Sequence, residues 1–310
     1  MGRLKDLFTD RIWSIDTNRV SLVSKSYARL VTLIKLVRIT IDTFAENRMG
    51  FQCVALSYFV TLALIPLLAF TFAVTGGMGL TNYIDTLLGF FSSFVDAGML
   101  NMVQEKAVNL IDIAKGGWVG VIAALSFLWT ILWMMFQVER VFNNVWGIRK
   151  IPRKIYTRFG FYILVLVLSP FLVILFGTGI AYYANFTKLV GLDLSEVRVI
   201  TKILGYVGFY VVATFTLSAM YKFIPATQVK YKHALRSAAI AAFVFVVFQY
   251  LYLETQVFVA RMNTVYGVLA AIPLFLIWLN FSWQIIIYGA ELTYSFQNVK
   301  NYGLQEEGLI

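Results

Sequence analysis

Six long stretches without a charged residue constrain this chain more than any other feature of its sequence. A charge at the centre of a membrane helix costs about 2.5–3.5 kcal/mol on insertion scales, so spanning segments exclude charged residues. About 20 apolar residues cross the roughly 30 Å hydrocarbon core as a helix, and only the fifth stretch is marginal in length. The stretches are 49–84, 116–138, 159–187, 203–221, 237–253 and 262–290.

The composition agrees with a membrane protein, because 60% of the residues are hydrophobic, 14% are charged and the mean hydropathy is +0.76. Soluble globular domains do not reach these values. We therefore predict an all-α polytopic membrane protein with a basic N-terminal region (1–48), a six-helix transmembrane domain (49–293) and a tail (294–310). The predicted spans are approximately 51–75, 117–138, 159–184, 200–221, 234–254 and 267–291.

The basic residues are distributed unevenly between the loops. With six spans, 20 of the 26 Lys and Arg residues fall on the side of the two termini. Cytoplasmic loops carry an excess of these residues, so both termini are predicted to be cytoplasmic. This orientation explains the net charge of +10 without a nucleic-acid partner.

Two regions outside the spans have an amphipathic pattern. Apolar residues between 23 and 44 recur at alternating spacings of four and three, which predicts a cytoplasmic helix before the first span. Its apolar face can lie on the anionic leaflet or pack under the bundle, and the sequence leaves both open. Between the first and second spans, residues 81–95 and 100–114 predict an extracytoplasmic amphipathic helical pair.

The sequence contains no recognisable catalytic constellation. A single cysteine, Cys53, and a single histidine, His233, cannot form a disulfide or a His/Cys metal site within one chain. No phosphate-binding glycine loop, GxSxG or HExxH motif occurs. We therefore expect no enzyme activity, metal or cofactor, and no ATP hydrolysis by this chain.

Polar residues and prolines inside the spans are the candidates for a substrate pathway. Asn280, Gln284 and Glu291 share one face of the sixth span, and a simple structural alternative is hydrogen bonding between helices. A proline removes a backbone donor and can kink its helix, and broken helices often line cavities. The candidates lining a cavity or binding substrate are Pro66, Glu139, Arg140, Asn143, Pro170, Gln249, Asn280, Gln284 and Glu291.

Glu291 is the carboxylate expected to matter most. It falls at the cytoplasmic end of the sixth span, at the same depth as Arg48, Arg140 and Lys222, which are candidate ion-pair partners. A buried carboxylate that loses its cation is destabilising by several kcal/mol. A hydrated glutamate at a helix end is the alternative interpretation.

Several blocks of sequence resemble the YihY/BrkB family of bacterial inner-membrane proteins. They are Ala-Leu-Ser-Tyr at 55–58 with Leu-Ile-Pro-Leu-Leu at 64–68, Val-Phe-Asn-Asn-Val-Trp-Gly at 141–147, Tyr-Lys-Phe-Ile-Pro at 221–225, Val-Tyr-Gly-Val-Leu-Ala-Ala-Ile-Pro-Leu-Phe-Leu-Ile-Trp-Leu at 265–279 and Tyr-Gly-Ala-Glu-Leu at 288–292. The resemblance implies a place in the bacterial inner membrane. The family is linked by name to virulence, and was once labelled ribonuclease BN, a label that no residue here supports.

Two functions remain open at this stage. The first is a transporter or flippase-like exporter of a lipid or other amphiphile, with anionic membrane lipids as partners of the basic cytoplasmic loops. The resemblance, through the family's association with the lipid envelope, agrees with it. The second is a non-transporting scaffold or partner subunit for envelope integrity. Substrate, coupling ion, homo-oligomeric state and protein partners do not follow from the sequence.

Overall fold

The computed structural model describes residues 25–77, 117–148, 194–260 and 264–299. All regular structure in these ranges is helical, and no strand occurs in them. The helices are α3 (Lys25–Glu46), α4 (Met49–Gly77), α7 (Gly117–Val145), α9 (Leu194–Phe223), α10 (Tyr231–Ala260) and α11 (Thr264–Asn298).

Five of the six predicted spans lie within these helices. α4, α7, α9, α10 and α11 contain the segments expected from the charge-free stretches, and each helix is longer than the predicted span. The third span (159–184), the helical pair between the first two spans, and the tail from residue 300 onward lie outside the described residues. The all-α prediction is therefore confirmed for the described part of the chain.

The helices expose apolar side chains in a way that water would not permit. Windows in Tyr231–Thr255 and Pro273–Asn298 are long and apolar enough to cross a membrane, and only 28% of each window is buried. Met49–Ala63 is a shorter apolar helix. Large side chains such as Phe51 (79% exposed) and Trp118 (82% exposed) point outward. A helix that is apolar on all sides and mostly unburied needs hydrocarbon as its solvent.

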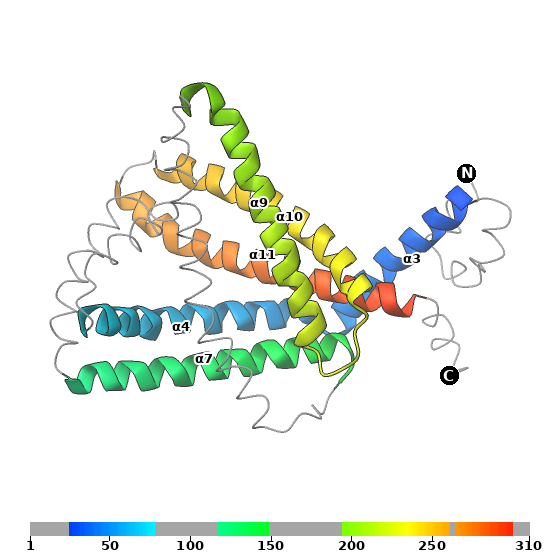
Figure 1. Ribbon diagram of the computed structural model, residues 1–310. Helices are drawn as coiled ribbons and strands as arrows, with labels where there is room; N and C mark the ends of the chain where they lie inside the picture. The colour runs from blue at the N-terminus through cyan, green and yellow to red at the C-terminus, as the bar shows by residue number, and fades with distance from the viewer. Residues whose placement is uncertain (1–24, 78–116, 149–193, 261–263, 300–310) are drawn as a thin grey trace.

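The helices pack in a chain of neighbours, with α9 on α10, α10 on α11, α11 on α4 and α4 on α7. Figure 1 shows α4 and α7 side by side along their lengths, while α9 crosses obliquely. α11 also contacts α3, α7 and α9, so it is the central helix of the described structure. The ends of α7, α9 and α11 meet the starts of α4 and α10 at one end of the molecule, which we call the junction end (Figure 1).

The buried core is concentrated at the junction end. It joins side chains of α4, α7, α9, α10 and α11, including Met49, Phe142, Tyr221 and Ile287. Small residues bring α10 and α11 close together, as is typical of membrane helices. Gly289 is one of them, because a Cβ atom there would lie 2.1 Å from the Tyr221 hydroxyl oxygen and 2.7 Å from the Ala241 Cβ.

α3 packs on α11 through one face and leaves another face exposed. Its buried side chains include Val31, Ile39 and Thr43, and Phe44 stacks on Tyr288 of α11 with ring centroids 3.9 Å apart. Most of the apolar face predicted from the sequence is the outer one, since Leu30, Val37 and Ile41 are half exposed. The packing alternative is thus observed, although mainly through a different face, and association with a leaflet stays a prediction.

A short corner joins α3 to α4. The backbone N–H of Asn47 donates to the Thr43 carbonyl, and Arg48 adopts a left-handed conformation with φ of 50°. The Gln52 side chain donates to the Asn47 carbonyl at 2.9 Å, which satisfies a backbone acceptor at the turn. The corner directs α3 away from the bundle and across α11 (Figure 1).

Candidate functional site

Two glutamates are buried at the junction end, Glu139 on α7 and Glu291 on α11. Glu291 is 0% exposed and Glu139 is 2% exposed. Glu291 follows the buried Ile287 by four residues, so it lies on the same inward face of α11. Glutamate is almost never fully buried unless it is paired, so both positions are unusual for the residue type.

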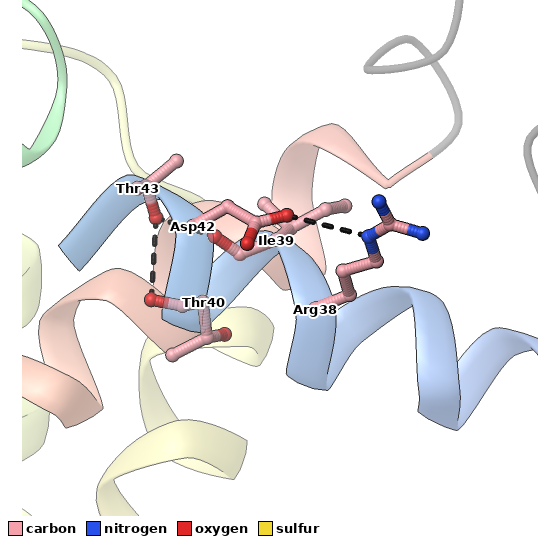
Figure 2. A network of polar contacts seen from close by, with 5 residues as sticks. All are labelled: Arg38, Ile39, Thr40, Asp42 and Thr43. Atoms are coloured by element: carbon pink, nitrogen blue, oxygen red, sulfur yellow. Dashed lines mark hydrogen bonds and ion pairs between the residues drawn. The ribbon is translucent and has the colours of Figure 1, made fainter. Parts of the chain in front are cut away.

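The carboxyl group of Glu291 is enclosed and has few polar neighbours. Thr43 of α3 and Asn47 at the corner are near enough to interact with it, but neither carboxyl oxygen makes a hydrogen bond of ordinary length and geometry in the part of the chain that the structure describes. The Thr43 hydroxyl donates its single proton to the Ile39 carbonyl at 2.6 Å. Figure 2 shows this hydroxyl next to Thr40, within α3. Enclosure of this kind disfavours the charged carboxylate.

The predicted ion pair of Glu291 is absent from the structure. Arg48 and Arg140 are exposed, and the Lys222 ammonium group donates to the Val229 carbonyl. Exposed guanidinium groups keep their hydration, and Lys222 has an acceptor in the connection between α9 and α10. As predicted, these three residues lie near the same end of the bundle as Glu291. Their charged groups nevertheless do not pair with its carboxyl group.

Asn143 fastens α7 to the connection between α9 and α10. It is buried, its side-chain nitrogen donates to the Glu139 carbonyl at 2.8 Å, and its side-chain oxygen accepts from the Ala226 backbone N–H at 2.7 Å. Both polar groups of the amide are therefore used by the backbone. In this structure Asn143 acts as a clamp between elements.

The polar residues nearer the middle of α11 make two separate contacts. The Gln284 amide nitrogen donates to the Asn280 side-chain oxygen at 2.7 Å, within one helix face. The Trp278 ring nitrogen donates to the Gln249 side-chain oxygen at 2.9 Å, which links α11 to α10. Asn280 and Gln284 share a face with each other as expected, but neither hydrogen-bonds to Glu291.

Similarity to known proteins identifies the family of the chain that carries these residues. The sequence profile of the Virulence factor BrkB family matches residues 40–308. The match runs from within α3 to beyond the end of α11 and contains Glu139, Asn143 and Glu291. The chain belongs to this family.

Relatives of this BrkB-family chain are named UPF0761 membrane proteins. One from Azotobacter vinelandii is 29% identical over an alignment of 276 residues, which covers 85% of this chain and 64% of the relative. One from Chromohalobacter salexigens is 28% identical and aligned over 77% of this chain and 57% of its own length. One from Aggregatibacter aphrophilus is 26% identical and aligned over 83% of this chain and 90% of its own length.

The chain thus spans less than two thirds of the first two relatives and most of the third. No solved structure matches it. The names of the relatives agree with the two apolar helices, among the described residues, that are long enough to cross a membrane, so this chain is an integral membrane protein of the BrkB/UPF0761 family.

One of the two predicted prolines of the BrkB-family chain lies within the described residues. α4 continues as a helix through Pro66, and Pro170 lies outside the described residues. Pro273 lies inside α11 and was not among the predicted candidates. It removes one backbone donor from this central helix.

Two hydroxyl contacts between helices were also missed. Thr40 of α3 and Ser295 of α11 have their hydroxyl oxygens 2.9 Å apart, and Ser237 of α10 is hydrogen-bonded to Thr293 of α11. The four residues are buried. The signal that could have found them is the spacing of small polar residues in the last two turns of α11, where Thr293 and Ser295 flank Tyr294 and point to different neighbours.

Proposed function

We propose that this chain is a transporter or flippase-like exporter of a lipid or other amphiphile in the bacterial inner membrane, with both termini cytoplasmic. The observation that carries the proposal is the Glu291 carboxyl group, which is fully buried and makes no well-formed hydrogen bond within the part of the chain that the structure describes. An ionisable group inside a membrane domain is expensive and is a functional candidate by default. A purely structural carboxylate would be expected to make at least one well-formed hydrogen bond.

The surroundings of Glu291 suit a group that changes its state during a cycle. A neutral carboxyl fits the enclosed position, whereas a charged carboxylate favours an arrangement in which water or a substrate head group reaches it. Because α11 contacts five other described helices, a change at Glu291 acts on the packing of the whole bundle. Binding of a proton or a polar head group would thereby be linked to a shift between two arrangements.

The experiment is lipid translocation in vesicles reconstituted with the full chain. A fluorescent phosphatidylglycerol is placed in both leaflets, and its accessibility to an external quencher is followed over time. We expect the parent protein to accelerate exchange and Glu291→Gln to lower the rate about tenfold, which corresponds to about 1.4 kcal/mol in a barrier. The amide keeps the shape of the side chain and removes only its ability to ionise.

Glu254→Gln is the matched control, because Glu254 is exposed on α10, far along the helix from the junction end. This variant should translocate lipid as the parent does. Thermal unfolding in detergent has to be measured for both variants, so that a loss of activity is not a loss of structure. A parent protein that moves lipid no faster than empty vesicles, or a fully active Glu291→Gln, overturns the proposal.

A non-transporting scaffold is the second candidate, and the interhelical hydrogen bonds favour it. Gln249 links α10 to α11, and Asn143 links α7 to the connection between α9 and α10, as polar groups do in membrane bundles of any function. A scaffold would show no translocation, and Glu291→Gln would change only its stability. The same vesicle experiment therefore separates the two candidates.

A further inference from the structure

An open apolar groove runs between α3, α10 and α11. Its volume is about 330 Å³, which is at the lower end of the range for small-molecule sites. The walls include Val37 and Ile41 of α3, Ile240 and Val244 of α10, and Leu292 of α11. The four residues from α3 and α10 are about half exposed, so no described part of the chain fills the groove.

Two of the walls continue toward cations, two on α10 and one on α3. On α10, Ile240 and Val244 belong to a row with a spacing of four residues that continues back to Arg236 and Lys232. Arg236 is about 6 Å and Lys232 about 12 Å from Ile240 along the axis. Both cations are exposed, and neither is ion-paired in the described ranges.

The α3 wall has the same polarity. Val37 and Ile41 belong to a row that continues back through Leu33 to Arg29, and both of these residues are exposed. The first turns of α3 and of α10 point toward the same end of the molecule in Figure 1. The groove therefore changes from apolar to basic in one direction along both walls. Arg38 is on another face of α3 and is paired with Asp42 at 3.5 Å (Figure 2).

We propose that the groove binds an acyl chain of an anionic phospholipid, with the phosphate of the head group held by Arg236 and Lys232. The groove exposes apolar surface along the length that an acyl chain would occupy. The cations lie beyond its end, at the position of that lipid's head group. A zwitterionic lipid would fit the apolar part equally well but would not satisfy the excess of positive charge. The inference rests on the proposed function for its biological role, because it names the lipid class and where that lipid enters.

Lipid binding to the full chain can be measured by native mass spectrometry in detergent. Phosphatidylglycerol and phosphatidylcholine are titrated separately, and the fraction of protein that carries one lipid is counted. We expect phosphatidylglycerol to be retained at concentrations at which phosphatidylcholine is not. The double variant Lys232→Gln/Arg236→Gln should bring the two lipids to the same occupancy, whereas the control Lys230→Gln should not, since Lys230 is off the row.

A second pair of variants tests the groove itself. Val244→Trp fills the groove and should weaken phosphatidylglycerol binding about tenfold. Val121→Trp places the same bulk on an exposed position of α7 and should have no effect. If Val244→Trp elutes as aggregate in gel filtration, Ile41→Trp makes the same test from the α3 wall.

Three results would overturn the inference. They are equal binding of the two lipids by the parent protein, unchanged binding in the groove variants, and a dimer that binds no lipid, which would assign the groove to a second copy. Binding in detergent does not depend on transport. A chain that binds phosphatidylglycerol here but does not translocate it would remove the proposed function and leave this site standing.

Discussion

Gly289 is the described glycine at which α9, α10 and α11 leave no space for a Cβ atom. The Tyr221 hydroxyl passes over it and donates to the Ile286 carbonyl at 2.9 Å, and the space for a Cβ atom is already taken by that hydroxyl and by Ala241. Tyr221 is buried in the core at the junction end. The close approach of three helices therefore depends on one missing methyl group.

We predict that Gly289→Ala destabilises the protein by about 1–3 kcal/mol, the usual cost of overpacking. Thermal unfolding in detergent measures the effect. Gly208→Ala is the matched control, because nothing lies within 4 Å of a Cβ at that position of α9. Alanine there should be neutral or stabilising by about 0.5–1 kcal/mol, since glycine weakens a helix interior. An equal response of the two variants would contradict the observed packing.

At the same scale, Glu291 shows what the sequence could and could not predict. It became a candidate because it is a rare carboxylate at the end of a span, and the structure buries it completely. Its partner did not follow, because helical periodicity gives the face of a residue but not the rotation of the neighbouring helices. The three predicted partners lie at the same depth as Glu291, but their side chains point away from it. These residues are Arg48, Arg140 and Lys222.

At the scale of the elements, α3 shows why an apolar stripe can point to the wrong face. The regular apolar spacing of α3 lies largely on its outer face, whereas Thr40 and Thr43 belong to the buried face. In a membrane protein the apolar side can meet lipid, and small or polar residues can mediate helix contacts. Rules taken from soluble helices therefore do not identify which face of α3 packs on α11.

The connection between α9 and α10 is held in position by Asn143 of α7, a contact that the sequence did not predict. We predict that Asn143→Ala destabilises the protein by about 1–3 kcal/mol, because a buried side chain that holds the Ala226 N–H is lost and the donor is left without its partner. Unfolding in detergent is the measurement. Asn144→Ala is the control, since its bond to the Asn47 carbonyl is long at 3.5 Å.

The outcome that would count against the Asn143 clamp is an Asn143→Ala variant as stable as Asn144→Ala. Protease sensitivity of the segment from Ile224 to Lys230 gives an independent measurement. That segment should be cleaved faster in Asn143→Ala, because its anchor to α7 is gone, while cleavage elsewhere stays at the level of the parent protein.

At the scale of the whole molecule, the helices that sequence could place are those whose interiors exclude charge. α10 and α11 were found in this way, and their lengths agree with membrane-crossing segments. What could not be predicted is the order of packing, in which α11 is central and contacts α3, α4, α7, α9 and α10. The absence of charged residues shows only that a segment lies away from the lipid head groups, and this holds for every span. It does not show which helices pack against each other.

The orientation of the whole chain is the last prediction, and it rests on the 20 of 26 basic residues that six spans place on one side. A cysteine in place of the exposed Gln228, in the connection between α9 and α10, should resist a membrane-impermeant thiol reagent in intact cells and react after permeabilisation. A cysteine in place of Lys106, which lies outside the described residues, should react in intact cells. Cys53 is buried and can stay in place as an internal background. The reverse labelling pattern would invert the topology, and with it the leaflet from which the groove on α3, α10 and α11 takes its lipid.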